Sequence, residues 1–335
     1  MLKHIYSLAV IGLLLSGHHL SAAARLSNLA KRALQTPRAK PTLPARPFAT
    51  RGFADNYFTR NPHFAQPIQR GYARLENTAL HDAITAGKIA EAKALIDAVS
   101  TEDINVHNLD AWTPLHLATL ANQVETVAAL LAKGAHVDAQ NSHGKTALHL
   151  AAADDNCAIA SLLITYGPNL DAVDDTGMTP LHEAARKNNH KIIDLLAEAG
   201  AQIDLLPHKT SVTPLHLAVM CNHTAAFYAL AEAGAHLEPV EMQASSTPLH
   251  AAAFHENAQI VGYLIQHHVN LNARDANGKT PLHCAVQGRA LGVIRQLLAA
   301  GADLHALDED KKTPADYAYD EVIDFLKQYL DTPAV

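Results

Sequence analysis

The sequence lacks the short motifs by which most enzyme classes are recognised. It contains no phosphate-binding Gly-rich loop, no Gly-x-Ser-x-Gly and no His-Glu-x-x-His. It also has only three cysteines, Cys157, Cys221 and Cys284, and none of them forms a Cys-x-x-Cys pair. An odd number of scattered cysteines encodes neither a disulfide framework nor a zinc ribbon, so we interpret all three as small buried hydrophobic residues. We therefore expect a protein that is not an enzyme and that needs no cofactor.

Basic residues are scarce after the first quarter of the chain. Residues 1–74 hold eleven Lys or Arg against one acidic residue, Asp55, whereas residues 75–335 hold fifteen against thirty-two. The first part therefore carries a formal charge of +10 and the second part −17, within a total of −7. So acidic a domain argues against nucleic acid as its ligand and favours a protein partner with a basic surface. The alternative is that the charge serves only solubility.

The first 24 residues have the order of a cleavable secretory signal peptide. Lys3 supplies a positive start, residues 8–15 are apolar, two histidines break the run, and residues 21–24 are small. An apolar run of eight residues is far shorter than the roughly 20 that a transmembrane helix needs. We expect cleavage near Ala23 or Ala24, and export of the protein to the periplasm, the medium or a host cell.

Residues 25–74 leave the compartment open between export and import into an organelle. Their start, residues 26–34, has the apolar stripe of a short amphipathic helix with a basic opposite face. An Arg-rich, acid-poor sequence follows, which also suits a mitochondrial presequence. The remaining interpretation is a largely disordered, Pro-rich linker. If the amphipathic helix is retained after processing, it is the one part that we expect to contact a membrane.

A Thr-x-Leu-His tetrapeptide recurs through the rest of the chain, residues 75–331. Its successive copies are 33 to 35 residues apart, and the last copy is degenerate. They start at Thr78, Thr113, Thr146, Thr179, Thr213, Thr247, Thr280 and Thr313. So regular a period is typical of a solenoid, in which each unit buries its apolar face only against its neighbours, and it indicates binding rather than catalysis. We number these repeats one to eight in chain order.

Each repeat has the signals of two helices. The Thr suits a helix N-cap, and the Pro that usually follows suits the first helical position, as in Thr179-Pro180. A small apolar face of Leu and Ala comes next, and a second helix carries apolar pairs such as Leu130-Leu131. A glycine then ends the second helix as a left-handed cap. In repeat six His268 replaces this glycine, and His is one of the few other residue types that tolerate a positive φ.

This combination of Thr-Pro-Leu-His, Leu-Leu and Gly-Ala, with an Asp-x-x-Gly turn before several of the threonines, resembles the ankyrin repeat. The resemblance covers about three quarters of the chain. It implies an all-α solenoid of stacked helix pairs joined by β-hairpin fingers, with a partner protein bound along the concave face and the fingertips. It also implies a structural role for the histidines of the tetrapeptide: His81, His116, His149, His182, His216, His250 and His283.

The other histidines and the cysteines do not indicate a metal or catalytic site. No His/Cys/Asp spacing recurs on one helix face, so we expect no zinc. A catalytic constellation would have to combine residues across the repeats, such as Cys221, His223 and His255. In a chain with 22 histidines such a combination arises by chance, so an enzyme is the least favoured interpretation.

The repeats depart most from their own pattern in the fingers that lead into repeats five and six. Both have lost the two turn residues, both carry a one-residue insertion, and both place apolar residues where polar ones are usual. On the first helix, the residue seven positions after the Thr is expected to face the concave groove, and in these repeats it is Met220 and Phe254. Our binding-site hypothesis joins both sets with two basic neighbours: Leu205, Leu206, Met220, Val240, Met242, Phe254, Arg186 and Lys187. The alternative is that the longer fingers fold back and bury their apolar side chains.

Trp112 is a second-rank contact candidate. It is the only tryptophan, and Trp is the residue type most enriched among interface hot spots. A lone Trp more often serves packing, so that alternative stays open.

Both terminal repeats are altered in ways that suit caps. Val99 stands where repeat one should have its glycine, and after Thr313 the last repeat lacks the Leu and the His. We therefore expect a complete array that acts as a monomeric interaction module or scaffold. An effector that an intracellular bacterium secretes is one protein of this kind. The alternative function is a membrane- or organelle-targeted adaptor that uses the basic amphipathic segment.

Overall fold

The computed structural model describes residues 78–206, 212–240, 245–319 and 321–331. The predictions for residues 1–74 and the predicted contact residue Met242 therefore lie outside the described residues. The chain divides into two compact units, residues 1–75 and 76–335, and every described residue belongs to the second unit.

Within repeats one to seven, a first helix of seven or eight residues is followed by a second helix of nine or ten. These pairs are α4 (Ala79–Thr85) and α5 (Ile89–Ala98), α6 (Pro114–Leu120) and α7 (Val124–Ala132), α8 (Ala147–Ala153) and α9 (Cys157–Thr165), α10 (Pro180–Lys187) and α11 (His190–Glu198), α12 (Pro214–Met220) and α13 (Thr224–Glu232), α14 (Pro248–Phe254) and α15 (Ala258–Gln266), and α16 (Pro281–Gly288) and α17 (Leu291–Ala299). Two 3-10 helices, η2 (Asp103–Asn105) and η3 (Pro314–Tyr317), and a last helix, α18 (Glu321–Asp331), complete the described elements.

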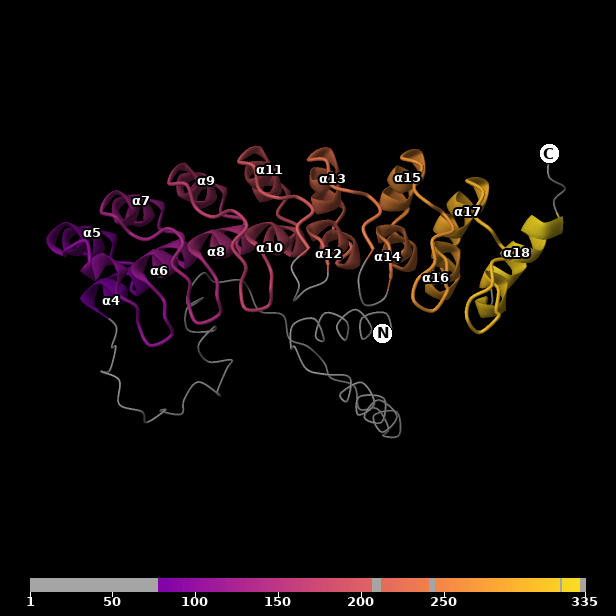
Figure 1. Ribbon diagram of the computed structural model, residues 1–335, viewed down its shortest axis with the longest axis horizontal. Coiled ribbons are helices and arrows are strands. Elements are labelled where there is room, and N and C mark those ends of the chain that lie inside the picture. Colours follow the sequence, from indigo (N-terminus) through magenta and orange to yellow (C-terminus); the bar gives the residue numbers. More distant parts are fainter. Residues whose placement is uncertain (1–77, 207–211, 241–244, 320, 332–335) are drawn as a thin grey trace, which may run out of the picture. The chain divides into compact units, whose positions relative to one another are not determined.

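Figure 1 shows the first helices side by side in one layer and the second helices side by side in another. The loops that lead from each second helix to the next Thr, here called the fingers, lie on the side of the first layer. The fifteen α-helices, with no strand among the described residues, confirm the predicted all-α solenoid. Among these helices, none combines the length and the apolar character that a membrane span requires.

The first helices begin directly after the Thr, as predicted, and the His three residues later completes the cap. In repeat two the backbone N–H of His116 bonds to Oγ1 of Thr113, and Nδ1 of His116 accepts the backbone N–H of Thr113 at 3.2 Å. This reciprocal capping box satisfies two N–H groups that a helix start would otherwise leave unpaired. The same box is present at the start of every first helix from α4 to α16.

The second helices end at the positions where the sequence predicted a glycine cap. Gly134 has a φ of 97°, and its successor Ala135 donates its N–H to the carbonyl oxygen of Leu130 at 2.9 Å. His268, the predicted substitute in repeat six, has a φ of 57°, and Val269 makes the equivalent bond to Leu264 at 3.3 Å. The left-handed conformation is thus kept although His lacks the freedom of glycine.

The fingers are tight turns. In the regular ones a single backbone bond joins the residue five before the Thr to the residue just before it, as from Asn108 N to the Trp112 oxygen at 3.0 Å. Neighbouring fingers are also joined, because Ser142 N donates to the Asp110 oxygen at 3.1 Å. One bond per finger is too few for a strand, which explains why the described fingers contain none.

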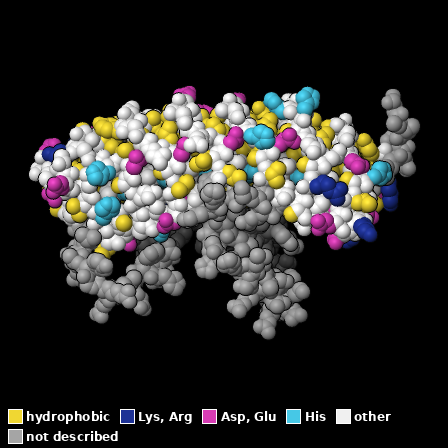
Figure 2. All heavy atoms as spheres, in the orientation of Figure 1, with side chains coloured by type: hydrophobic (Ala, Val, Ile, Leu, Met, Phe, Trp, Pro, Cys, Tyr) yellow, Lys and Arg dark blue, Asp and Glu magenta, His cyan; other side chains and the backbone are white. Residues whose placement is uncertain are grey.

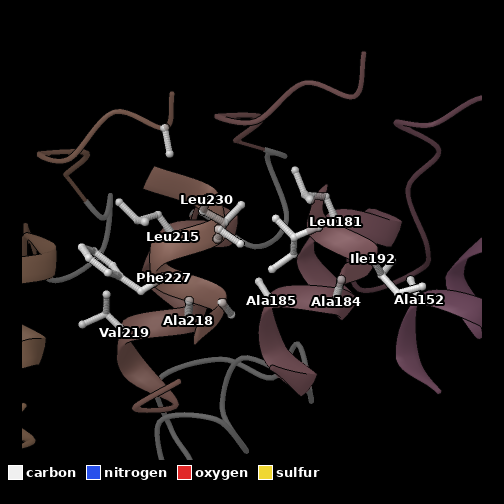
Figure 3. Packing of buried hydrophobic residues seen from close by; sticks show 14 of the residues in the cluster. Ala152, Leu181, Ala184, Ala185, Ile192, Leu215, Ala218, Val219, Phe227 and Leu230 are labelled. Carbon is white, nitrogen blue, oxygen red and sulfur yellow. The ribbon is translucent and has the colours of Figure 1, made fainter. Parts of the chain in front are cut away.

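The core runs continuously between the two helix layers. Figure 3 shows Leu181, Ala184 and Ala185 of α10 packed beside Leu215 and Ala218 of α12, with no exposed surface on any of the five. The alanines let the first helices approach closely, and larger side chains such as Phe227 fill the space toward the second helices. The three cysteines were expected to belong to this core, but all three are only partly buried. Cys157 begins α9, Cys221 follows the end of α12 and Cys284 lies within α16, and the side chains of Cys157 and Cys284 pack against the core.

An aromatic side chain joins the last repeat to repeat seven. Tyr317 of η3 donates its hydroxyl to Oδ2 of Asp308 at 2.6 Å, and the Nζ atoms of Lys279 and Lys312 lie 4.9 and 5.1 Å from its ring centroid. The hydrogen bond to the Asp308 carboxylate raises the pKa of Tyr317 to about 12. Tyr317 therefore faces repeat seven, where its ring also lies edge-on to the His283 ring with centroids 6.1 Å apart.

Candidate functional site

A row of buried histidines joins each repeat to the next. Because Nδ1 accepts the Thr N–H, the ring proton sits on Nε2, which donates to the carbonyl oxygen of the residue just before the next Thr. Six of these bonds, between 3.0 and 3.1 Å long, pair His81 with Trp112, His116 with Lys145, His149 with Met178, His182 with Val212, His250 with Lys279 and His283 with Lys312. The histidines thus hold the stack together in addition to capping its helices.

Burial keeps these imidazoles neutral. It lowers the pKa of His116 and of His182 to about 4, and it lowers the pKa of the other five in the same direction. Only the neutral ring can accept at one nitrogen and donate at the other. The desolvation that lowers the pKa therefore also preserves the bonds.

His216 is the exception in this row. It keeps its bonds to Thr213, but its buried Nε2 has no hydrogen-bond partner among the described residues. Burial lowers its pKa, and the nearby carbonyl of Ser246 opposes that effect without completing the bond. Ser246 belongs to the finger of repeat six, one of the two irregular fingers, so among the described residues this finger lacks the histidine bond that the other fingers accept.

A second row of bonds joins the loops at the base of the fingers. Six side-chain oxygens, one per repeat, accept a backbone N–H from the next repeat at 2.6 to 3.0 Å. They belong to Asn105, Asp138, Asp171, Asp204, Glu238 and Asn272, which we call the rung residues. The sequence analysis missed them because their partners are backbone groups 31 or 32 residues away, although five of the six are Asn or Asp at one position of the repeat, which is the signal that could have found them.

The predicted apolar contact residues lie in two rows. Met220 and Phe254 are the last residues of the neighbouring helices α12 and α14, and both are half-buried. Leu205 and Leu206 are half-buried at the base of a finger, whereas Val240 is 53 % exposed in the next. A seven-residue helix is about 10 Å long, so roughly this length separates the two rows. The structure brings Met220 beside Phe254, and the fingers form a separate row.

The two predicted basic residues differ. Lys187 is exposed, whereas Nη2 of Arg186 lies 2.5 Å from Oε2 of Glu183, whose side chain is only 3 % exposed. Nζ of Lys145 lies 2.5 Å from the other carboxylate oxygen. Burial by itself raises the pKa of Glu183, but Lys145 and Arg186 outweigh it and lower the pKa overall. Arg186 is therefore committed to an internal ion pair, and Lys187 remains available to a partner.

The last residue of the irregular finger of repeat five is buried. Val212, the residue before Thr213, is fully buried and forms a small separate cluster with Met178 and Leu217. Met178, at the same position of the regular finger before it, is also buried, so the burial of Val212 does not come from the irregularity of its finger, and Val240 in the next finger remains exposed.

Trp112 also has a packing role. Its ring lies edge-on to the His116 ring, with centroids 5.9 Å apart, and its carbonyl oxygen accepts the bond from His81. It is half-buried, so part of its surface still faces solvent.

No group of three or more His, Cys, Asp or Glu side chains within the described residues is arranged to hold a metal ion. The residues of the catalytic alternative have other partners: Nδ1 of His223 lies 3.2 Å from the Ala185 oxygen, and the His255 ring packs edge-on against Phe254. Burial raises the pKa of Cys221, which disfavours the reactive thiolate.

Lys and Arg are unevenly distributed over the array. On the face shown in Figure 2 they gather near the C-terminal end, whereas Asp and Glu are spread along its length. The sequence agrees, because Lys209 is the only basic residue between Lys191 and Arg274, a stretch that holds seven acidic residues. The middle of the array is therefore its most one-sidedly acidic part.

Comparison with known proteins gives the family. Ankyrin repeats, described in units of three copies, match residues 60–141, 80–174, 148–241 and 215–308. No curated protein matches the chain. The matches span most of the sequence and coincide with the helix pairs, and ankyrin repeats indicate a protein–protein interaction module. The chain belongs to the ankyrin-repeat family.

Proposed function

We propose that this protein is a non-enzymatic scaffold that binds a partner protein across the fingers and first-helix ends of repeats four to six. The main support is that the side chains that bond the repeats together are not the apolar side chains that remain partly exposed. The histidine row and the rung residues hold the repeats together, whereas Met220, Phe254 and Val240 make no such bond and remain partly exposed. Partly exposed apolar side chains on a rigid framework are what a protein interface uses.

The partner has a basic surface, and the protein binds it as a monomer. The formal charge of −17 on residues 75–335 supports the first point, because it attracts and orients a positively charged protein. A large negative charge also disfavours the approach of a second copy, which supports the second point.

The test compares two double variants of the full chain. Met220→Asp with Phe254→Asp should weaken binding of the partner, identified by affinity capture from the native cell, by at least about tenfold in calorimetry, because charges replace apolar contacts. Leu120→Asp with Ala153→Asp changes the same positions in repeats two and three and should leave the affinity unchanged. Equal affinities of the two variants would refute the proposed location.

We also propose that residues 1–24 direct export. The support is their order of positive, apolar and small residues. Mass spectrometry of the mature protein from its native cell should find Arg25 as the first residue. A first residue near Ala49 would indicate a mitochondrial presequence instead.

A further inference from the structure

An exposed apolar row crosses three consecutive fingers. Val173 is 45 % exposed, Leu206 is half-buried and Val240 is 53 % exposed, and each stands two residues after a rung residue. We call these three the finger row. Residues at this position lie side by side in successive repeats, since the amide of Gln140 donates to the Val173 oxygen at 3.2 Å. Polar residues, Gln140 and Arg274, occupy the position on either side of the row.

A row of carboxylates runs beside the finger row. The rung residues two positions earlier are Asp171, Asp204 and Glu238, and each accepts only backbone N–H groups. In the part of the chain that the structure describes, no Lys or Arg lies within ion-pairing distance of these three. Their charge is therefore available to a partner that lies along the finger row.

The spacing of the two rows selects the shape of the partner. Packed helices are about 8–10 Å apart, so carboxylates on successive repeats recur at about that distance. A polyproline II segment has three residues per turn and rises about 3.1 Å per residue, so every third side chain falls on one face about 9 Å apart. Such a segment can place a base opposite each carboxylate and an apolar side chain on each finger-row residue.

We propose that the finger row and its carboxylates bind an extended, polyproline II segment of a partner protein with Lys or Arg at every third residue. This inference rests on the proposed function, because it specifies the partner's chemistry at that surface. Charge complementarity to the carboxylates requires Lys or Arg in the partner segment, and the exposed valines require apolar residues between those bases.

The probe is a peptide of four Arg-Pro-Leu triplets, and its control is a peptide of the same composition with the four Arg adjacent. Fluorescence anisotropy with the full chain should show tighter binding of the periodic peptide, by about tenfold. Equal binding of the two peptides would overturn the proposal, because it would show attraction by net charge alone.

Two other rung residues show which substitution removes the charge and keeps the fold. Asn105 and Asn272 serve as rung residues with bonds of 2.7 and 2.9 Å, so an amide can replace a carboxylate there. The triple variant Asp171→Asn, Asp204→Asn, Glu238→Gln should lose the preference for the periodic peptide. Asp194→Asn with Glu198→Gln and Glu232→Gln removes the same charge from exposed positions on α11 and α13 and should keep the preference.

The two proposals fail in different ways. If the triple variant binds the natural partner as tightly as its matched control, while Met220→Asp with Phe254→Asp does not, the inference falls and the proposed function stands. If neither variant weakens partner binding, both fall. A third variant, Val173→Ser with Val240→Ser, should weaken the periodic peptide severalfold without changing the melting temperature, because both side chains are exposed.

Discussion

Nε2 of His116 in repeat two lies 3.0 Å from the carbonyl oxygen of Lys145, the residue that precedes repeat three. The same bond recurs along the array, and only a neutral imidazole can make it while Nδ1 accepts from the Thr. Stability of the array therefore depends on the protonation of groups that ordinarily titrate near neutral pH.

Mild acid should destabilise the array. The folded pKa of His116 and His182 is about 4, against 6.5 for an exposed His, so below pH 6.5 the unfolded chain binds more protons than the folded one. Their contribution is complete above about pH 6.5 and is lost as the pH falls toward 4, at up to about 1.4 kcal/mol per pH unit for each. Urea unfolding at pH 7.5, 6.5 and 5.5 measures this slope. A free energy of unfolding that stays constant over this range would contradict it.

The missing bond of His216 should be measurable as a difference between two variants. His182→Ala and His216→Ala remove the same volume and the same capping bonds, but only the first removes an inter-repeat bond. His182→Ala should therefore cost about 1 kcal/mol more in the free energy of unfolding. Urea unfolding of both variants decides this, and equal costs would show that His216 is bonded in solution.

Gly288 should not tolerate a side chain. A Cβ placed there would lie 2.6 Å from the Phe254 oxygen, so α14 and α16 would have to separate. We expect Gly288→Ala to lower the free energy of unfolding by roughly 1–3 kcal/mol. Gly292→Ala is the control, because nothing lies within 4 Å of its Cβ, and this change in α17 should raise stability by up to about 1 kcal/mol. Thermal melts of the two variants should shift in opposite directions.

The buried Glu183 should be replaceable only together with its partner. Glu183→Gln removes the carboxylate shared by Lys145 and Arg186, leaves among the described residues only Asp174 at 3.9 Å from Nζ of Lys145, and should cost about 1–3 kcal/mol. Glu183→Leu with Lys145→Met should be within about 1 kcal/mol of the parent, since Leu217 occupies the equivalent position in α12. Chemical denaturation of both variants tests this, and a large loss in the double variant would show that the charge itself is needed.

Local rules predicted the elements of this fold, and long-range pairing accounts for what they missed. Thr-Pro starts, glycine ends and the left-handed His268 follow from each residue's own conformational limits, and the structure has all of them. The Glu183 ion pair and the contacts of Tyr317 join residues in different repeats, so no single repeat reveals them.

The candidate site was predicted less completely for the same reason. Met220 and Phe254 could be found because the period aligns equivalent positions. Val173 was missed because its finger is regular, and only its exposure beside Val240 makes it part of a row. Val212 was not distinguished from its neighbours in sequence, yet it is buried by a side chain from another repeat.

The absent bond at His216 also has a mechanical meaning. Each inter-repeat bond connects neighbours only, so a pull applied to the two ends passes through every junction in series, and the array extends first where the fewest bonds resist. Within the described residues the histidine row is interrupted only at His216, between repeats five and six, although Asn257 adds side-chain bonds to Asn222 and Thr224 across the same junction. A stretched molecule should therefore open first on the finger side of that junction, where the histidine bond is missing, while the Asn257 bonds still hold the helices of the two repeats together.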